Sequence, residues 1–193
     1  MKLEGIVFDC DGTLADTMPL HWQAWRVIAE RHRFHFPEDR FYSLGGVPSR
    51  DILQMLRLEQ KLSINPIAVA LEKEQAYLPL LPQVRPIHAV VEIARENHGI
   101  IPLAVASGGT KVVIELVLRH LGIRELFAAV VTSEDVTKQK PAPDIFLEAA
   151  RRIGVDARFC RGYEDTELGI QAIRAAGMHA IDVREVLGVT PAS

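Results

Sequence analysis

Short apolar segments that each end in a polar turn recur along this chain and limit the folds open to it. Two of them cover residues 5–9 and 101–106, and three more cover residues 128–132, 159–163 and 179–183. Helical stretches separate them, and strands that alternate with helices in this way form a parallel sheet. We therefore predict an α/β fold whose buried strands have polar carboxyl ends.

The ends of the predicted helices are marked by glycine and threonine. Four glycines stand just past apolar stretches of helical period, where a left-handed cap favours glycine, namely Gly99, Gly122, Gly154 and Gly177. Thr110 and Thr166 precede the next helical stretches, and their hydroxyls can accept a free N–H of the first turn. Both threonines are predicted N-caps.

A helical insertion follows the first predicted strand, because no β-branched strand pattern occurs there. Three amphipathic stretches cover residues 20–31, residues 49–61 and the segment that begins at Asn65. The predicted division is a core of residues 1–17 and 80–193 and a small helical cap of residues 18–79.

Composition excludes several classes of protein. The 22 Lys and Arg against 25 Asp and Glu give a net charge of −3, and 48% of the residues are apolar. These values argue against a disordered chain, and against a nucleic-acid binder that works by bulk positive charge. Cys10 and Cys160 are too few for a disulfide scaffold, and neither an export signal nor a membrane span is recognisable. We expect a cytoplasmic protein with no nucleic-acid or membrane partner; a monomer is compatible with the sequence, which does not fix the oligomeric state.

The sharpest chemical feature is Asp9-Cys-Asp11-Gly-Thr13, directly after the first predicted strand. Residues i and i+2 leave a strand on the same side, so two carboxylates share one polar site and call for a cation such as Mg²⁺. One carboxylate can attack while the other transfers protons, and Thr13 adds a hydroxyl and an N–H for a phosphate. The alternative is an acidic turn after a strand. A calcium loop is excluded, because its glycine belongs at the sixth place and here stands fourth.

Three further groups stand where predicted strands end or helices begin. Ser107-Gly108-Gly109-Thr110 offers a hydroxyl and N–H donors, Lys140-Pro fixes an ammonium group before a helix, and Glu164-Asp165 adds two carboxylates. Taken singly, they are also explained as a plain turn, a surface lysine and helix-capping acids. Together they place metal-type carboxylates, a nucleophile and phosphate donors at one edge of the sheet.

In this order, the four groups resemble the motifs of the haloacid dehalogenase (HAD) superfamily, over the whole chain. The branch with β-phosphoglucomutase and small sugar-phosphate phosphatases is similar in its cap segments, His21-Trp-Gln-Ala-Trp and Gly46-Val-Pro-Ser-Arg50. The length of the chain and the sequence of its cap segments most resemble those of bacterial fructose-1-phosphate phosphatases. The resemblance implies a Rossmann-like parallel sheet with helices on both faces and a helical cap.

The resemblance also implies a role for each matching residue. Asp9 would attack phosphorus and form an aspartyl-phosphate, while Asp11 would protonate the leaving oxygen and then deprotonate water. The implied Mg²⁺ ligands are Asp9, Asp11 through its backbone carbonyl, Glu164 and Asp165. The implied phosphate- or substrate-binding residues are Thr13, His21, Arg50, Ser107, Gly108 and Lys140. His21, from the cap, would orient Asp11, with helical packing as the alternative.

Some residues differ from the family pattern, and these differences bear on the choice of substrate. Gly109 and Thr110 stand where the mutase carries a serine and a lysine for its second phosphate, which favours a substrate with one phosphate. Arg50 sits one position from the mutase's cap arginine. Arg161 stands where the family has an aliphatic residue, so either this strand is partly exposed or an acid such as Asp182 pairs with the arginine.

We therefore predict a Mg²⁺-dependent phosphatase that acts on a small sugar monophosphate, with fructose 1-phosphate as the first candidate. A hexose phosphomutase is the second hypothesis. A non-enzymatic binding protein on the same fold is the third, and it is prompted only by Arg161.

Overall fold

A five-stranded sheet forms the centre of the larger of the two bodies in the computed structural model, which describes residues 2–188. Its order is β5-β4-β1-β6-β7, and every neighbouring pair is parallel. The strands are β1 (Gly5–Phe8), β4 (Leu103–Ser107), β5 (Ala129–Thr132), β6 (Cys160–Glu164) and β7 (His179–Asp182). The predicted parallel α/β sheet is therefore confirmed, with each strand within two residues of its predicted limits.

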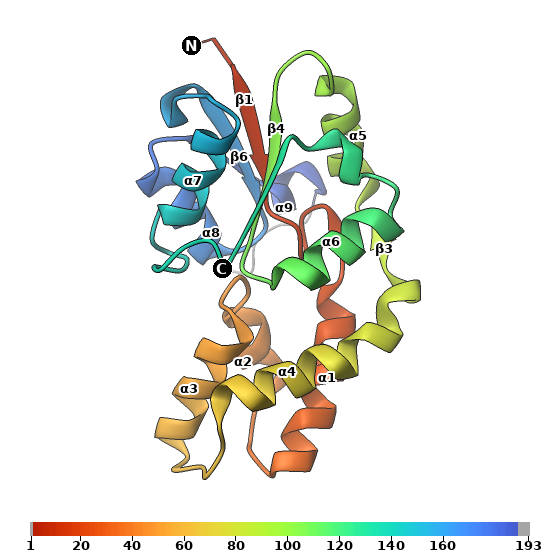
Figure 1. The fold of residues 1–193 in the computed structure, drawn as a ribbon, viewed down its shortest axis with the longest axis vertical. Coiled ribbons are helices and arrows are strands. Elements are labelled where there is room, and N and C mark those ends of the chain that lie inside the picture. The colour runs from red at the N-terminus through yellow and green to blue at the C-terminus, as the bar shows by residue number, and fades with distance from the viewer. Residues whose placement is uncertain (1, 189–193) are drawn as a thin grey trace.

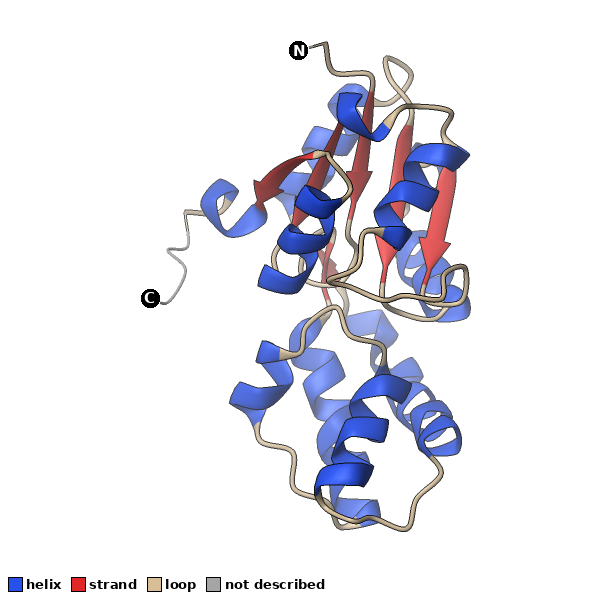
Figure 2. Cartoon of the chain, turned by 90° about the vertical axis from the view of Figure 1, so that its left-hand side faces the viewer, coloured by secondary structure: helices blue, strands red, loops and turns tan. Residues whose placement is uncertain are grey.

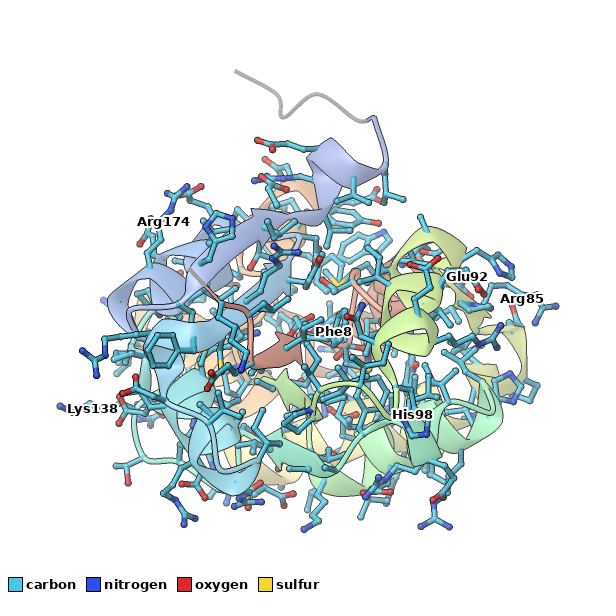
Figure 3. All side chains as sticks on the ribbon, turned by 90° about the horizontal axis from the view of Figure 1, so that it is seen from above. Phe8, Arg85, Glu92, His98, Lys138 and Arg174 are labelled. Carbon is cyan, nitrogen blue, oxygen red and sulfur yellow. The ribbon has the colours of Figure 1, made fainter. Side chains whose placement is uncertain are left out.

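Helices cover both faces of this sheet (Figure 2). The larger body contains α5 (His88–Asn97), α6 (Lys111–His120), α7 (Asp144–Arg152), α8 (Glu167–Ala175), α9 (Val183–Val186) and the short 3-10 helices η2 (Arg124–Leu126) and η3 (Ala157–Phe159). Side chains alternate along β1, so Ile6 and Phe8 pack with α5, α6 and α9 on one face, whereas Val7 packs with α7 and α8 on the other. In Figure 3, Phe8 lies in the middle of the molecule and charged side chains such as Lys138 and Arg174 lie at its periphery.

The predicted helix ends are mostly confirmed. The four cap glycines have positive φ angles of 79° at Gly99, 65° at Gly122, 71° at Gly154 and 77° at Gly177. Thr166 Oγ1 accepts a hydrogen bond from the Gly169 N–H. Thr110 occupies the N-cap position of α6, but its hydroxyl makes no capping bond. The prediction of a hydroxyl cap at Thr110 was therefore wrong, and Glu134 supplies the acceptor instead.

Four helices form a second body below the carboxyl edge of the sheet (Figure 1). They are α1 (Met18–His32), α2 (Glu38–Ser43), α3 (Ser49–Glu59) and α4 (Pro66–Tyr77). Apolar side chains from all four, including Trp25, Phe41, Leu53 and Val69, form a core of their own. The sequence pattern indicated three helical stretches, and the short α2 between them was missed.

Both connections between the two bodies lie side by side. Residues 15–16 before α1 form β2 (Ala15–Asp16), and the returning chain passes through the 3-10 helix η1 (Leu78–Gln83) into β3 (Arg85–Pro86). The two strands pair antiparallel. This two-stranded ribbon was not predicted, because segments of two residues carry no readable periodicity.

None of the helices within residues 2–188 has the length and apolar character needed to cross a membrane.

Candidate active site

The carboxyl ends of neighbouring strands bring together most of the polar residues that the sequence pattern selected. Asp9 follows β1, which lies between β4, ending at Ser107, and β6, ending at Glu164. These groups therefore meet at the middle of the edge that faces α1 to α4 (Figure 1). The predicted residues here form three hydrogen-bonded groups. They are Asp11 with His21 and Ser107, Lys140 with Asp9 and Glu164, and Thr13 with Asp165.

Lys140 joins two buried carboxylates. Its Nζ lies 2.6 Å from Asp9 Oδ1 and 2.8 Å from Glu164 Oε1, and at most 5% of any of the three side chains is exposed. Burial acts to lower the pKa of Lys140, but Asp9 and Glu164 outweigh it and hold that pKa above its usual value. Lys140 is therefore a fixed positive charge beside Asp9, and not the surface lysine of the alternative interpretation.

Negative charge exceeds positive charge around this lysine. Burial raises the pKa of Asp9 well above its usual value; Lys140 opposes that rise, while Glu164 and Asp165 add to it. Burial and Glu164 raise the pKa of Asp165 to about 7, and Thr13 Oγ1 donates a hydrogen bond of 2.8 Å to this carboxylate. The site thus favours a further cation.

Asp11 has an environment of the opposite kind. Thr17 Oγ1 lies 2.6 Å and His21 Nε2 lies 3.2 Å from Asp11 Oδ1, and Ser107 Oγ donates to Oδ2 over 3.3 Å. Burial acts to raise the pKa of Asp11, but the hydrogen bonds from His21 and Thr17 hold it at about 2. Two carboxylates separated by one residue therefore lie in different environments, Asp9 beside a buried lysine and Asp11 among three side-chain donors.

The chain was compared with known proteins. The haloacid dehalogenase-like hydrolase family matches residues 3–177. The chain belongs to this family.

Relatives of this HAD-like hydrolase include named sugar-phosphate enzymes. It is 40% identical to the fructose-1-phosphate phosphatase YqaB of Escherichia coli (strain K12), over 95% of this chain and 97% of that protein. It is 32% identical to the β-phosphoglucomutase of Bacillus subtilis (strain 168), over 94% of this chain and 83% of that protein. A crystal structure of β-phosphoglucomutase from Clostridium difficile matches with a TM-score of 0.83 at 27% identity, covering 97% of this chain and 88% of that one. The Rossmann-like fold expected from the resemblance is confirmed.

The HAD-like hydrolase contains site residues that the sequence pattern did not select. Lys73 Nζ lies 2.9 Å from His21 Nδ1 and 3.3 Å from Glu74 Oε1, and the Tyr77 ring stacks on the imidazole at 4.0 Å between centroids. Lys73 is only 3% exposed. Val69, Lys73 and Tyr77 follow one another at intervals of four residues, so the sequence already places Lys73 on the apolar face of a helix. A lysine in that position needs a buried partner, and this pattern could have identified it.

A loop of the helical body reaches the carboxyl edge. A Cβ atom at Gly108 would overlap the backbone carbonyl of Gly46, and one at Gly46 would lie 3.3 Å from Lys140 Cδ. Gly46 also has a φ of 82°, which favours glycine. The two backbones therefore meet without a side chain between them, and the loop closes over the hollow that Asp9, Asp11 and Ser107 line.

Arg50 belongs to none of the three hydrogen-bonded groups at this edge. Its side chain is 46% exposed, and its Nε lies 3.4 Å from Asp51 Oδ1. It lines a neighbouring hollow with Thr110 and Glu134, whereas Ser49 lies between the two hollows. The structure thus places Arg50 one hollow away from the carboxylates.

Of the two alternatives for Arg161, the partly exposed strand agrees with the structure, because this side chain is half-buried, and the pairing with Asp182 was wrong. Both Asp182 oxygens accept hydrogen bonds from Arg184, at 2.6 Å for the shortest. Arg161 instead lies 3.4 Å from the Tyr163 hydroxyl. Asp182 is the N-cap residue of α9, and Arg184 lies in the first turn of that helix. The two side chains are therefore close neighbours.

Proposed function

We propose that this HAD-like hydrolase is a Mg²⁺-dependent phosphatase that hydrolyses a small sugar monophosphate through an aspartyl-phosphate, with fructose 1-phosphate as the first candidate. The observation that carries the proposal is the pair Asp9 and Asp11. Asp9 lies beside a buried lysine, and Asp11 accepts hydrogen bonds from Thr17, which precedes the helical insertion, and from His21 within it. The named activity of the relative that is 40% identical supports the choice of substrate.

In the first step, a carboxylate oxygen of Asp9 attacks phosphorus while the bond to the sugar oxygen breaks. The leaving oxygen takes a proton from Asp11. A phosphate ester with a second pKa near 6 can deliver that proton on binding, and its charge raises the pKa of Asp11. Water then attacks the aspartyl-phosphate, returns its proton to Asp11, and releases phosphate and free Asp9.

Lys140, Ser107 and the backbone N–H of Gly108 are the donors for the transferring phosphoryl oxygens. Lys140 already lies 2.6 Å from Asp9 Oδ1, so its charge is in place where negative charge grows. Thr13 holds Asp165 through its hydroxyl. Catalysis in this proposal comes from position and charge.

The donor set fits Mg²⁺. All the predicted ligands are oxygen atoms, and the carboxylates outnumber the one lysine that contacts them. Within residues 2–188, no three His, Cys, Asp or Glu side chains already form a ligand cluster. Mg²⁺ keeps several waters and takes only one or two carboxylates, so Asp9 and Asp165 would be enough. When bound, Mg²⁺ would neutralise charge on the phosphoryl oxygens.

The predicted ligands differ in how free their oxygens are. Asp9, Asp165 and the Asp11 carbonyl are the first choice. Glu164 Oε2 accepts hydrogen bonds from the Thr166 N–H and hydroxyl, and its Oε1 faces Lys140. Glu164 would bind the ion only if Oε1 exchanged Lys140 for it, so we propose it as the conditional ligand.

We also propose residues 18–79 as a cap that excludes water and selects the sugar. His21 and Lys73 lie on α1 and α4 of this segment, and they reach Asp11 from it.

The test is phosphate release by the purified protein from a panel of sugar mono- and bisphosphates, with Mg²⁺ or with chelator, and with Asp9→Asn as control. We expect Mg²⁺-dependent release from a hexose 1-phosphate, reduced by about 10³-fold or more in the variant. Isomerisation that depends on a bisphosphate, with no net release, would instead establish the mutase. Absence of both would favour the binding protein.

A further inference from the structure

A second hollow continues from the one that contains Asp9. The two share four residues as common walls, Ser49, Glu74, Gly108 and Gly109. From there the second hollow runs past residues of both bodies, among them Arg50, Thr110, Ser133 and Glu134. A substrate longer than its phosphate therefore has a path from the reacting end to a distal end.

Both hollows combine apolar and polar walls. On the cap side, the first contains Trp25, Phe41 and Ile52, and its polar side chains His21 and Lys73 already bond to Asp11 and to each other. The second contains Ile67, Ala70 and Leu71 beside the Ser49, Thr110 and Ser133 hydroxyl groups and two carboxylates. Sugar hydroxyl groups need hydrogen-bond partners when they leave water, so we place the sugar end in the second hollow, beside these hydroxyl groups.

Glu134 lies at the distal end with its carboxylate on a helix terminus. Its Oε2 accepts a hydrogen bond of 2.7 Å from the Lys111 N–H, the first backbone N–H of α6. That terminus is where a second anionic group of a substrate would gain most from the helix dipole. The place is already taken by a negative charge.

Positive charge in the second hollow is scarce. Among the described residues that line it, Arg50 is the one basic side chain, and Asp51 lies 3.4 Å from its Nε. Glu74, on the shared wall, adds a further carboxylate and faces Lys73 and Ser49. The distal end is therefore unfavourable for an anion and favourable for hydroxyl groups.

We infer that Glu134 is a specificity-determining residue, which closes the distal end of the substrate hollow to a second phosphate and restricts turnover to monophosphates with an uncharged, hydroxyl-bearing far end. This inference rests on the proposed function for the reacting end, and it adds the class of substrate that the other end accepts.

The test compares two substrates that differ only at the far end, fructose 1-phosphate and fructose 1,6-bisphosphate. For each we measure kcat/KM of phosphate release from position 1, in the wild type and in the variants Glu134→Gln and Glu134→Ala. Gln removes the charge and keeps an acceptor for the Lys111 N–H, whereas Ala also frees that N–H. Glu125→Gln is the matched control, because this exposed glutamate precedes β5 at the opposite edge of the sheet.

We expect the ratio of bisphosphate to monophosphate kcat/KM to rise by about tenfold in Glu134→Gln, and further in Glu134→Ala. The rise should shrink at high salt, since the charge is exposed. Glu125→Gln should leave the ratio unchanged. An equal ratio in the wild type and both Glu134 variants would overturn the inference.

A binding measurement separates this inference from the proposed function. Titration calorimetry with Asp9→Asn, alone and combined with Glu134→Gln, gives the affinity ratio of the same two ligands without turnover. If the wild type released no phosphate from any substrate, the proposed function would fail, and the affinity ratio would still decide the role of Glu134. A ratio that Glu134→Gln does not change would overturn the inference by this route as well.

Discussion

Lys73 Nζ lies 2.9 Å from His21 Nδ1. An ammonium group can only donate, so Nδ1 is the acceptor and a neutral imidazole carries its proton on Nε2. Burial, and after it Lys73, lowers the pKa of His21, which keeps the ring neutral near pH 7. The Nε2–H therefore donates to Asp11 Oδ1 at 3.2 Å. The lysine fixes the direction of the hydrogen bond that positions the proposed acid–base residue.

Replacing Lys73 by methionine tests this positioning role. Methionine fills similar space without a donor, so His21 can take either tautomer. We expect kcat to fall about tenfold or more, with a smaller change in KM. The pKa of His21 should rise, because the positive charge that lowers it is gone; NMR titration of the imidazole measures this shift. Lys61→Met, at an exposed site of the helical body, is the control. Unchanged kcat and an unchanged His21 pKa would contradict the role.

Replacing His21 by alanine separates catalysis from packing. His21 is 8% exposed and stacks on Tyr77, but it also donates to Asp11. We predict that His21→Ala lowers turnover more than thermal stability, as measured by phosphate release and melting temperature, with exposed His120→Ala as control. A large loss of stability with normal specific activity would place His21 in packing only.

A chelator tests whether the excess negative charge around Asp165 serves to bind Mg²⁺. With the protein treated with chelator, phosphate release should stop and return when Mg²⁺ is added. In Asp165→Asn, one of the proposed carboxylate ligands is lost, so the Mg²⁺ concentration for half-maximal activity should rise about tenfold or more. Binding should also raise the melting temperature of the wild type. Activity that is insensitive to chelator would refute the Mg²⁺ proposal.

Stability in acid should depend on Asp135, which joins the end of β5 to α7. Its Oδ2 accepts from the Thr132 N–H and hydroxyl, and its Oδ1 accepts from Arg152 at 2.6 Å. Burial opposes the shift, but the hydrogen bonds from Arg152 and Thr132 lower the pKa of Asp135 below its usual 3.8.

A carboxylate with a lowered folded-state pKa stabilises the fold fully above its unfolded-state pKa, and this contribution is lost as the pH falls through the folded-state value. Asp135→Asn should therefore lower the free energy of unfolding by about 1–2 kcal/mol at pH 7, and by less as the pH falls below 3.8. Denaturant unfolding at several pH values measures this, with exposed Glu96→Gln as control. A deficit that stays constant with pH would show that the charge of Asp135 is not the cause.

Most of the fold follows from local pattern, because strand and helix periods are properties of neighbouring residues. Strands such as β1 and caps such as Gly99 were predicted for this reason. Asp9, Ser107 and Glu164 were predicted to meet because the carboxyl ends of parallel strands share one edge. The helix α2 and the ribbon of β2 and β3 are too short to leave such a signal.

The residues that escaped prediction depend on contacts between distant segments. Lys73 lies 52 residues from His21 in the chain, and Glu134 lies 23 residues from Lys111. Nothing in a helical pattern indicates which carboxylate will reach the end of another helix. Thr110 is the converse case. Threonine is a common N-cap residue, but here the Glu134 carboxylate, and not the Thr110 hydroxyl, accepts a hydrogen bond from the first turn of α6.

The ribbon of β2 and β3 ties together the two crossings between the bodies. Ala15 pairs with Pro86 and Asp16 with Arg85, so the outgoing and returning chains form one strap. If residues 18–79 open as the proposed cap, this strap is where the chain would bend. His21 follows the outgoing crossing and Lys73 precedes the returning one, so both would move with the helical body. Opening would then take His21 away from Asp11 in the same motion that admits water.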